Sequence, residues 1–348
     1  MAQRAVPLVA LLPQEALRVT APVLEVSRLT TRFDTPHGSI TAVDGVSFAV
    51  RRGETLGLVG ESGSGKSVTA MSILRLVAPP GRIEAGSVRL DGTDLLTLDQ
   101  EQMRRRRGTE IGMVFQNPMT ALNPVFSIGW QMREALRAHD HPGDADATIE
   151  QALTAVGMPD AARQAASFPH QMSGGMRQRV VIAMSMLHRP QLLIADEPTT
   201  ALDVTIQAQV LGLMKRLTRE RGTALLLITH NMGVIARMCD RVAVMYAGEI
   251  VEEAPVDALF SQPRHPYTQG LLRSMPRADQ QRGKLASLGG SPPDMTRPLK
   301  GCRFRARCDM ARAGCEIHPD LLALAPGHSA RCWVAQDLAR CEEVPGVR

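Results

Sequence analysis

An eight-residue segment rich in glycine and serine, GESGSGKS from Gly60 to Ser67, constrains this chain more than any other feature. It fits the pattern G-x-x-x-x-G-K-[ST] in full, after the apolar stretch ETLGLVG and before KSVTAMSILRLV, whose apolar residues have helical spacing. In such a loop between a strand and a helix, backbone N–H groups and the positive end of the helix dipole converge on phosphate oxygens. The segment therefore predicts a nucleotide site at the end of a buried strand.

The nucleotide contacts are expected to involve the whole loop and the first turn of the helix. The residues expected to bind the nucleotide are Gly60, Glu61, Ser62, Gly63, Ser64, Gly65, Lys66, Ser67 and Val68. Lys66 is predicted to contact the β- and γ-phosphates, and Ser67 is predicted to bind Mg²⁺.

Polar side chains follow three further apolar stretches, where parallel strands would end. LLIADEP ends in Asp196, which could complete the Mg²⁺ shell, and Glu197, which could polarise the attacking water as general base. His230 follows TALLLIT and is predicted to contact the γ-phosphate; Gln116 follows IGMVF, where its amide could reach Mg²⁺ or the attacking water. Taken singly, each could be a solvated strand end or a helix cap. Beside the phosphate loop, we interpret Glu197, His230 and Gln116 as a catalytic group.

The alternation of strand-like and helix-like stretches predicts an α/β fold. Short β-branched stretches dominate about residues 22–115, and strand–helix alternation returns over about 180–250. Such alternation is typical of a parallel sheet covered on both faces, and 348 residues with 44% hydrophobic composition suffice for two or three packed units. The expected parts are a flexible extension at 1–21, a nucleotide-binding domain at 22–260 with a helical subdomain at about 117–180, and an extension at 261–348.

The segment MSGGMRQR, which begins at Met172, narrows the class. It resembles the LSGGQ-type signature of ABC ATPases, with Met172 and Met176 in place of the usual leucine and glutamine. A serine and two glycines at a helix start can present N–H groups to a phosphate. The resemblance implies that two chains sandwich two ATP molecules, and that the ATP of the opposite subunit is bound by Ser173, Gly174, Gly175 and Met176.

Two other positions resemble the ABC ATPase pattern. TTALD ends in Asp203, which looks like the key residue of a dimer-contacting loop. Phe33 lies where the family stacks an aromatic ring on adenine, although it could simply be strand core. The resemblance covers about residues 22–260 and implies a P-loop NTPase fold of the ABC ATPase type, with a helical subdomain and a small Cys-rich C-terminal extension.

Longer stretches resemble the ATPases of oligopeptide/dipeptide importers. They are VGESGSGKS, MVFQNPMTALNPVFSIGWQ, PHQMSGGMRQRV, DEPTTALDVTIQAQ and RHPYTQGLL. The resemblance implies ATP-driven peptide import, a second ATPase subunit (identical or homologous), two permeases that dock on residues 117–130, and an external substrate-binding protein. Import of another cargo, such as a metal complex or a glycoside, stays open, as does a soluble ABC ATPase without a transport role. The presence of Glu197 counts against a regulatory nucleotide binder that never hydrolyses.

Composition bears on location and partners. No apolar run approaches the roughly 18 to 20 residues of a membrane-spanning helix, so we expect a peripheral protein held by its partners on the cytoplasmic face of the inner membrane. Pro7 interrupts the short apolar run near the N-terminus, which disfavours a secretory signal. With a net charge of +5 and 3% aromatic residues, we expect no nucleic-acid partner. The run Arg104 to Arg107 could touch acidic lipid or a permease, or form a solvated helix face.

Four of the six cysteines gather in the C-terminal extension: Cys302, Cys308, Cys315 and Cys332. Their spacing fits neither the common zinc patterns nor the usual ferredoxin runs, but four thiolates in a reducing compartment favour a metal group over disulfides. The importer resemblance implies a [4Fe–4S] cluster, which we prefer; Zn²⁺ is the alternative, and unliganded thiols or disulfides stay open. Cys239 and Cys341 are expected to be ordinary.

Overall fold

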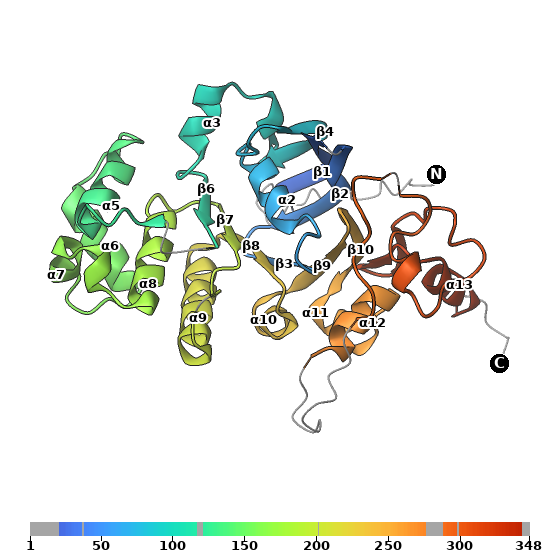
Figure 1. Ribbon diagram of the computed structural model, residues 1–348. Helices are drawn as coiled ribbons and strands as arrows, with labels where there is room; N and C mark the ends of the chain where they lie inside the picture. The colour runs from blue at the N-terminus through green and yellow to red at the C-terminus, as the bar shows by residue number, and fades with distance from the viewer. Residues whose placement is uncertain are drawn as a thin grey trace, which may run out of the picture.

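The computed structural model describes residues 21–36, 38–116, 121–200, 202–275, 288–297 and 299–342. Two β-sheets form the middle of the molecule, with a group of helices at one end and the C-terminal segment at the other (Figure 1). Of the extension predicted at 1–21, all but Ala21 lies outside the described residues.

The smaller sheet is antiparallel and has the strand order β2-β1-β4-β5. Its strands are β1 (Pro22–Thr35), β2 (Gly38–Arg51), β4 (Gly81–Leu90) and β5 (Thr93–Asp94). On β1, Leu24 and Val26 are buried and Glu25 between them is exposed. This alternation places one face of the sheet against the core and leaves the other to solvent.

The larger sheet has the order β11-β12-β10-β9-β3-β8-β7-β6. Its strands are β3 (Thr55–Val59), β6 (Ile111–Val114), β7 (Leu192–Asp196), β8 (Ala224–Thr229), β9 (Arg241–Tyr246), β10 (Glu249–Pro255), β11 (Leu322–Ala325) and β12 (His328–Ala330). The strands β9, β3, β8, β7 and β6 pair in parallel, whereas β10, β12 and β11 continue the sheet in antiparallel pairs. The prediction of a parallel sheet is confirmed for the five strands from β9 to the β6 edge.

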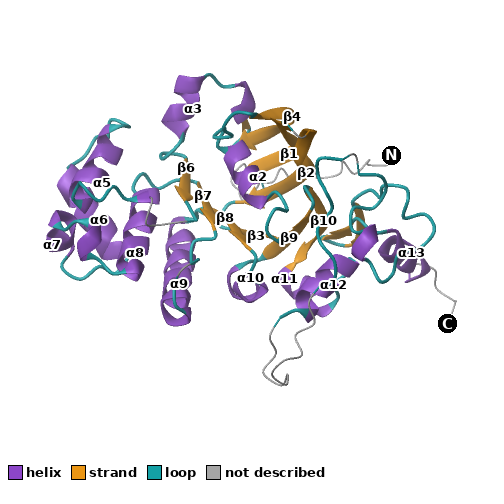
Figure 2. Ribbon diagram, in the orientation of Figure 1, coloured by secondary structure: helices purple, strands orange, loops and turns teal. Residues whose placement is uncertain are grey.

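Helices of the described residues cover both sheets and form a lobe of their own. They are α2 (Lys66–Ile73), α3 (Gln100–Arg106), α5 (Ile128–Arg137), α6 (Ala145–Ala155), α7 (Ala161–Ala166), α8 (Gly174–Ser185), α9 (Val204–Arg221), α10 (Met232–Met238), α11 (Val256–Ser261), α12 (Pro266–Arg273) and α13 (Trp333–Glu342). Short 3₁₀ turns lie at η1 (Leu95–Thr97), η2 (Pro169–Gln171) and η3 (Arg305–Arg307). The helices α5 to α8 gather to one side, whereas α2 lies between the two sheets (Figure 2).

Two apolar cores lie on opposite faces of the larger sheet. On β8, Leu225 and Leu227 belong to one core, and Leu226 and Ile228 belong to the other. Successive side chains of a strand point to opposite faces, so a strand buried on both faces reads as a continuous apolar run. One core is shared with α2 and the antiparallel sheet, and the other with the helical lobe and α9 to α12.

The C-terminal segment is joined to this sheet and core. β12 pairs with β10 through Glu252 opposite Ala330, and so extends the larger sheet. Tyr267 and Phe304 are buried in the core that lies on the α10 side. Among the described residues, no helix combines the length and the apolar character that crossing a membrane requires.

Candidate functional site

The phosphate loop joins the buried strand β3 to α2, which starts at Lys66. Gly65 caps this helix with a φ of 104°, in the left-handed region. A Cβ on Gly65 would lie 2.3 Å from the carbonyl oxygen of Ala42, and one on Gly60 would lie 2.1 Å from that of Met245. Neighbouring backbone thus occupies the space of a side chain, and the tight loop needs glycine at both positions.

Lys66 lies inside the loop and is only 6% exposed. Its Nζ donates hydrogen bonds to the carbonyl oxygens of Gly60 at 2.9 Å and Glu61 at 2.8 Å, and to Oγ of Ser64 at 3.3 Å. Burial lowers the pKa of Lys66, and nearby carboxylates oppose that effect. The ammonium group is therefore where the sequence analysis predicts phosphate binding, surrounded by oxygen atoms that a bound phosphate could replace.

Asp196 and Ser67, two of the three residues predicted to reach Mg²⁺, lie together, whereas the third, Gln116, donates a hydrogen bond to Glu197. Asp196 ends β7, is 3% exposed and accepts a hydrogen bond from Ser67. Its Oδ1 is buried and has no hydrogen-bond partner in the described part of the chain. Burial raises the pKa of Asp196, and the hydrogen bond from Ser67 opposes the rise. A bare carboxylate oxygen beside a hydroxyl at a phosphate loop fits the oxygen ligands that Mg²⁺ prefers.

Three side chains converge on the carboxylate of Glu197. Its Oε1 lies 2.8 Å from Nδ1 of His230. Its Oε2 accepts hydrogen bonds from Nε2 of Gln116 at 3.1 Å and from the hydroxyl of Thr200 at 3.0 Å. The structure thus brings together the three residues predicted as a catalytic group, with Gln116 bonded to Glu197. Thr200 was not predicted, although it follows Glu197 by three residues in EPTT.

The backbone and the charge of Glu197 are both unusual. Its φ is 45°, a left-handed conformation that costs a non-glycine residue about 1 to 3 kcal/mol and is often found at functional sites. Burial alone would raise the pKa of Glu197, but hydrogen bonds from His230 and Thr200 outweigh it, and the pKa lies below its ordinary value. The carboxylate is therefore ionised at neutral pH and able to accept a proton.

The signature residues and Asp203 start two neighbouring helices. The hydroxyl of Ser173 caps α8 by accepting the N–H of Met176 at 3.3 Å, and Asp203 caps α9 by accepting the N–H of Ile206 at 2.9 Å. A Cβ on Gly175 would lie 2.8 Å from Cγ2 of Ile206, so the two helix starts are in close contact. Ser173 and Asp203 are exposed and available to a second chain; their contacts with a partner stay predictions.

Phe33 lies on the strand layer next to the phosphate loop. It is half-buried on β1, opposite Ile40 and Gly81. Its ring covers Gly81, where a Cβ would lie 2.5 Å from Cε1 of the phenyl ring. Ile40 lies two residues before Ala42, whose carbonyl group touches Gly65 of the loop. Adenine stacking on Phe33 stays a prediction.

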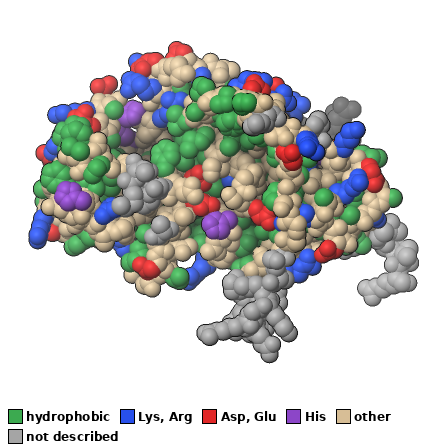
Figure 3. Space-filling view, viewed as in Figure 1, with side chains coloured by type: hydrophobic (Ala, Val, Ile, Leu, Met, Phe, Trp, Pro, Cys, Tyr) green, Lys and Arg blue, Asp and Glu red, His purple; other side chains and the backbone are tan. Residues whose placement is uncertain are grey.

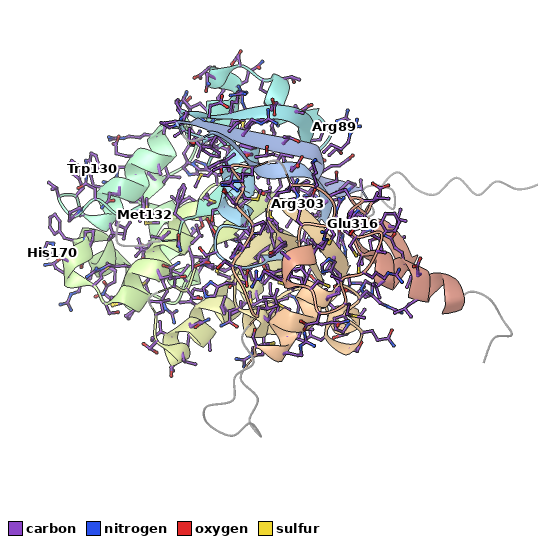
Figure 4. All side chains as sticks on the ribbon, turned by 45° about the vertical axis from the view of Figure 1, so that its right-hand side comes forward. Arg89, Trp130, Met132, His170, Arg303 and Glu316 are labelled. Atoms are coloured by element: carbon purple, nitrogen blue, oxygen red, sulfur yellow. The ribbon has the colours of Figure 1, made fainter. Side chains whose placement is uncertain are left out.

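An apolar surface lies between the sheets and the helical lobe, where Figure 3 shows hydrophobic side chains gathered. The residues that line this groove include Leu74, Leu76, Met113, Phe115, Val181 and Met184. Beyond it, the rings of Phe126 and Trp130 stack 3.9 Å apart, and Trp130, labelled on the helical lobe in Figure 4, is 41% exposed. Of residues 117–130, predicted to receive a permease, 117–120 lie outside the described residues.

The four clustered cysteines line one small pocket, together with residues such as His265 and Trp333. Burial, together with the three other thiols of the cluster, raises the pKa of Cys302 to about 11. Four soft sulfur donors around one cavity fit the chemistry of an iron–sulfur cluster or zinc. Over the described ranges, however, no three or more His, Cys, Asp or Glu side chains are arranged to hold a metal ion. Cys239 is buried against Gly57 in the core, and the side chain of Cys341 is outside the described part.

The sequence analysis missed two side chains that reach the phosphate loop from the C-terminal segment. The hydroxyl of Tyr267 accepts the N–H of Glu61 at 2.9 Å. The guanidinium group of Arg307 donates to both carboxylate oxygens of Glu61, at 2.7 and 2.9 Å. These partners are 206 and 246 residues apart in the sequence, so no local pattern could have indicated them.

Three arginines of the run at 104–107 form ion pairs with glutamates of the same chain. Arg104 and Arg105 both pair with Glu101, and Arg106 pairs with Glu110. Ion pairs between residues three or four apart are typical of a solvated helix face, which was one of the two interpretations of this run.

Comparison with known proteins identifies the family. The ABC transporter family model matches residues 43–200, and the model of the oligopeptide/dipeptide transporter C-terminal region matches residues 251–315. A peptide import ATP-binding protein of Brucella ovis is 50% identical over 333 residues, which are 91% of this chain and 98% of the relative. The oligopeptide transport ATP-binding protein OppD of Salmonella typhimurium is 47% identical over 313 residues, 89% of this chain and 93% of the relative.

Solved structures agree with this result. The dimeric structure of MJ0796, a bacterial ABC transporter cassette, matches with a TM-score of 0.59 and 27% identity over 67% of this chain and 98% of that chain. A post-hydrolysis dimer of the same cassette, bound to ADP and phosphate, matches with a TM-score of 0.60 over the same shares. The predicted ABC ATPase fold is confirmed. The chain is an ATPase subunit of the ABC transporter family and belongs to its oligopeptide/dipeptide branch.

Proposed function

We propose that this chain hydrolyses ATP to drive peptide import through an ABC transporter. Relatives named for peptide import and oligopeptide transport support a peptide cargo, and so does the match to the C-terminal region of such transporters. The observation that carries hydrolysis is the carboxylate of Glu197, which is ionised and held by three side chains at the strand end beside the bare Oδ1 of Asp196. A metal complex or a glycoside is the alternative cargo.

Each site residue has a proposed part in the reaction. Residues Gly60 to Val68 bind the phosphates, and the ammonium group of Lys66 exchanges its carbonyl partners for phosphate oxygens. Ser67 and Asp196 would hold Mg²⁺, which neutralises charge on the phosphates when it is bound. Glu197 accepts a proton from the attacking water, while His230 and Gln116 keep its carboxylate oriented.

The chain works as half of a pair in this proposal. Ser173 to Met176 bind ATP held by a second ATPase subunit, identical or homologous, and Asp203 contacts that subunit. The exposure of Ser173 and Asp203 at two adjoining helix starts supports this, as does the apolar Val204 beside them, which is 82% exposed. The dimeric form of the related cassette MJ0796 agrees with it. Phe33 would stack on the adenine ring.

We further propose that two permeases hold the pair on the cytoplasmic face of the inner membrane, with a substrate-binding protein as an indirect partner and no nucleic acid. The exposed Phe126–Trp130 stack and the neighbouring apolar groove support docking at residues 117–130, because exposed apolar surface of this kind marks protein contacts. In this division, residues 22–260 form the ATPase domain, with its helical subdomain at about 117–180, and residues 261–348 form the extension.

We propose a [4Fe–4S] cluster at Cys302, Cys308, Cys315 and Cys332, with Zn²⁺ as the alternative. The shared cavity of the four thiols supports a metal group. Iron, sulfide and zinc analysis of anaerobically purified protein distinguishes the two groups, and a protein free of all three contradicts both.

The test of the function uses the whole assembly. The tagged full-length chain is purified from native membranes, and its ATPase activity is measured in liposomes with and without the co-purified binding protein and a peptide mixture. We expect permease subunits to co-purify and peptide to stimulate hydrolysis. If no permease co-purifies, the proposed role in transport is contradicted. If a metal complex or a glycoside stimulates hydrolysis and peptides do not, the proposed peptide cargo is contradicted and the alternative cargo is supported.

A further inference from the structure

The phosphate loop is tied to the cysteine-bearing C-terminal segment through a single residue, Glu61. Tyr267 accepts its N–H, Arg307 binds its carboxylate, and its carbonyl oxygen accepts a hydrogen bond from Lys66. Two of these three contacts, those from Tyr267 and Arg307, come from outside the ATPase motifs. Glu61 is therefore a junction between the loop that binds ATP and the segment after residue 260.

The contact between Arg307 and Glu61 has the geometry of a strong ion pair. Two N–H groups of the guanidinium meet the two carboxylate oxygens, a bidentate arrangement that fixes orientation as well as distance. The side chain of Arg307 is only 4% exposed and that of Glu61 27%, so solvent screens the pair little. The guanidinium group also lies 5.7 Å from the ring centroid of Tyr246 and 5.8 Å from that of Phe304, which hold it in place.

A second route from the same segment reaches the loop. Arg303 donates hydrogen bonds to the carbonyl oxygen of Ala247 and to Asp44. The next residue, Gly248, donates its N–H to the carbonyl oxygen of Ser64 in the phosphate loop at 2.9 Å. In Figure 4, Arg303 lies where the C-terminal segment meets the sheets, with Glu316 beside it toward α13. The C-terminal segment thus contacts the phosphate loop directly at Glu61 and, through Ala247 and Gly248, at Ser64.

We propose that Arg307 is a positioning residue for ATP binding, which acts by holding Glu61 and with it the phosphate loop in the form that accepts phosphates. The inference rests on the proposed ATPase function and adds a specific dependence: ATP affinity is set in part by the cysteine-bearing segment. Arg307 directly precedes Cys308, so the fold of the thiol-bearing loop determines where the guanidinium group lies.

The effect is expected on ground-state binding. A residue that shapes the empty loop changes the binding of ATP and of the transition state equally, and so raises KM while kcat is retained. Loss of a bidentate charged pair of this kind corresponds to roughly a tenfold change in affinity.

The test measures the Kd of Mg·ATP by calorimetry on the full-length chain, and KM and kcat on the transporter complex. Arg307→Met is expected to raise Kd and KM roughly tenfold while kcat stays within about twofold of the wild-type value. Arg307→Lys, which keeps the charge but not the bidentate geometry, is expected to raise Kd and KM by less. Glu61→Gln keeps the size of the side chain and leaves the cysteine segment untouched, and should give a similar rise. The double variant should be no worse than the worse single one, because both changes remove the same contact.

Arg305→Met is the matched control. Arg305 belongs to the same 3₁₀ turn, but its side chain is 46% exposed and pairs with Glu316 at 3.5 Å, away from the loop. It should leave Kd and KM unchanged. A purely structural role for Arg307 would lower the melting temperature and the active fraction while Kd and KM of the folded protein stayed at the wild-type value, and that result would overturn the proposal.

The remaining outcomes are also decisive. If Arg307→Met does not fold, Glu61→Gln decides alone: an unchanged Kd overturns the inference. A wild-type chain that binds no Mg·ATP would instead contradict the proposed function, so the two failures are distinguishable.

Discussion

Nδ1 of His230 lies 2.8 Å from Oε1 of Glu197, so a hydrogen bond joins the residues that follow two neighbouring parallel strands. β7 ends at Asp196 and β8 at Thr229, and the carboxyl ends of parallel strands meet at one edge of the sheet. The bond therefore follows from the topology. It makes the charge and orientation of Glu197 depend on a residue that is otherwise exposed.

The first prediction concerns the general base. Glu197→Gln keeps the shape of the side chain and removes its ability to accept a proton, so kcat should fall by about 10² to 10⁴. Binding of Mg·ATP should be retained, and the ATP-bound dimer should accumulate, as seen by size-exclusion chromatography. Glu220→Gln is the control, since Glu220 is an exposed residue near the end of α9. Turnover close to wild type in Glu197→Gln would remove the role assigned to Glu197.

The second prediction concerns the pH dependence of hydrolysis. Burial pulls the pKa of Glu197 upward, and the hydrogen bonds from His230 and Thr200 pull it below its ordinary value. His230→Ala removes one of these bonds and leaves the burial, so the pKa of Glu197 should rise. Because activity needs the ionised carboxylate, the acid limb of the kcat profile should move to higher pH.

Thr200→Val is the comparison for that profile. It removes the other hydrogen bond and should move the limb in the same direction. Rates measured across the acid range check both variants. A limb that stays in place in both would show that Glu197 is not the group that titrates.

The third prediction separates two glycines of the phosphate loop. Gly63 and Gly65 both have positive φ, 78° and 104°, so alanine at either costs about 1 to 2 kcal/mol in the backbone. Only Gly65→Ala also brings a Cβ to within 2.3 Å of Ala42, whereas nothing lies within 4 Å of a Cβ at Gly63. Gly65→Ala should therefore lose about 1 to 3 kcal/mol more in urea unfolding and weaken Mg·ATP binding far more. Equal effects in the two variants would contradict this.

The predictable part of the site consists of residues whose positions follow from strand ends and helix starts. Glu197 and His230 come directly after an apolar strand and Gln116 comes two residues after one, so the alternation of strands and helices was enough to bring them to one edge. The capping roles of Ser173 and Asp203 follow in the same way from their place before a helix.

The part that could not be predicted depends on tertiary contacts over long separations. Nothing near Glu61 in the sequence indicates that Arg307 binds its carboxylate, because the pair forms only when the C-terminal segment packs against β9 and the loop. The pairing of β12 with β10 could not be predicted from the sequence either, because a strand of three residues, His328 to Ala330, is too short to show a periodic pattern of apolar residues.

The last prediction concerns a buried histidine that links this segment to the sheet. His265 is 1% exposed, its Nδ1 accepts the N–H of Tyr267 at 3.0 Å, and its backbone N–H donates to Oε2 of Glu252 at 2.9 Å. Burial lowers the pKa of His265 to about 4, against 6.5 for an exposed imidazole. Between these two pH values the unfolded chain binds a proton that the folded chain does not. The free energy of unfolding therefore falls as the pH drops from 6.5 toward 4, by about 3 kcal/mol in all.

His265→Asn keeps a hydrogen-bond acceptor at the start of α12 but cannot take up the proton. Its smaller side chain should lower stability at about pH 7.5, yet the further loss on going to about pH 4.5 should be roughly 2 to 3 kcal/mol smaller than in the wild type. Urea unfolding at the two pH values measures the difference, and His170→Asn, at an exposed histidine, serves as the matched control that should retain the wild-type loss. The same acid-induced loss in His265→Asn and in the wild type would show that other groups govern acid unfolding, because only the proton on His265 distinguishes the two proteins in this window.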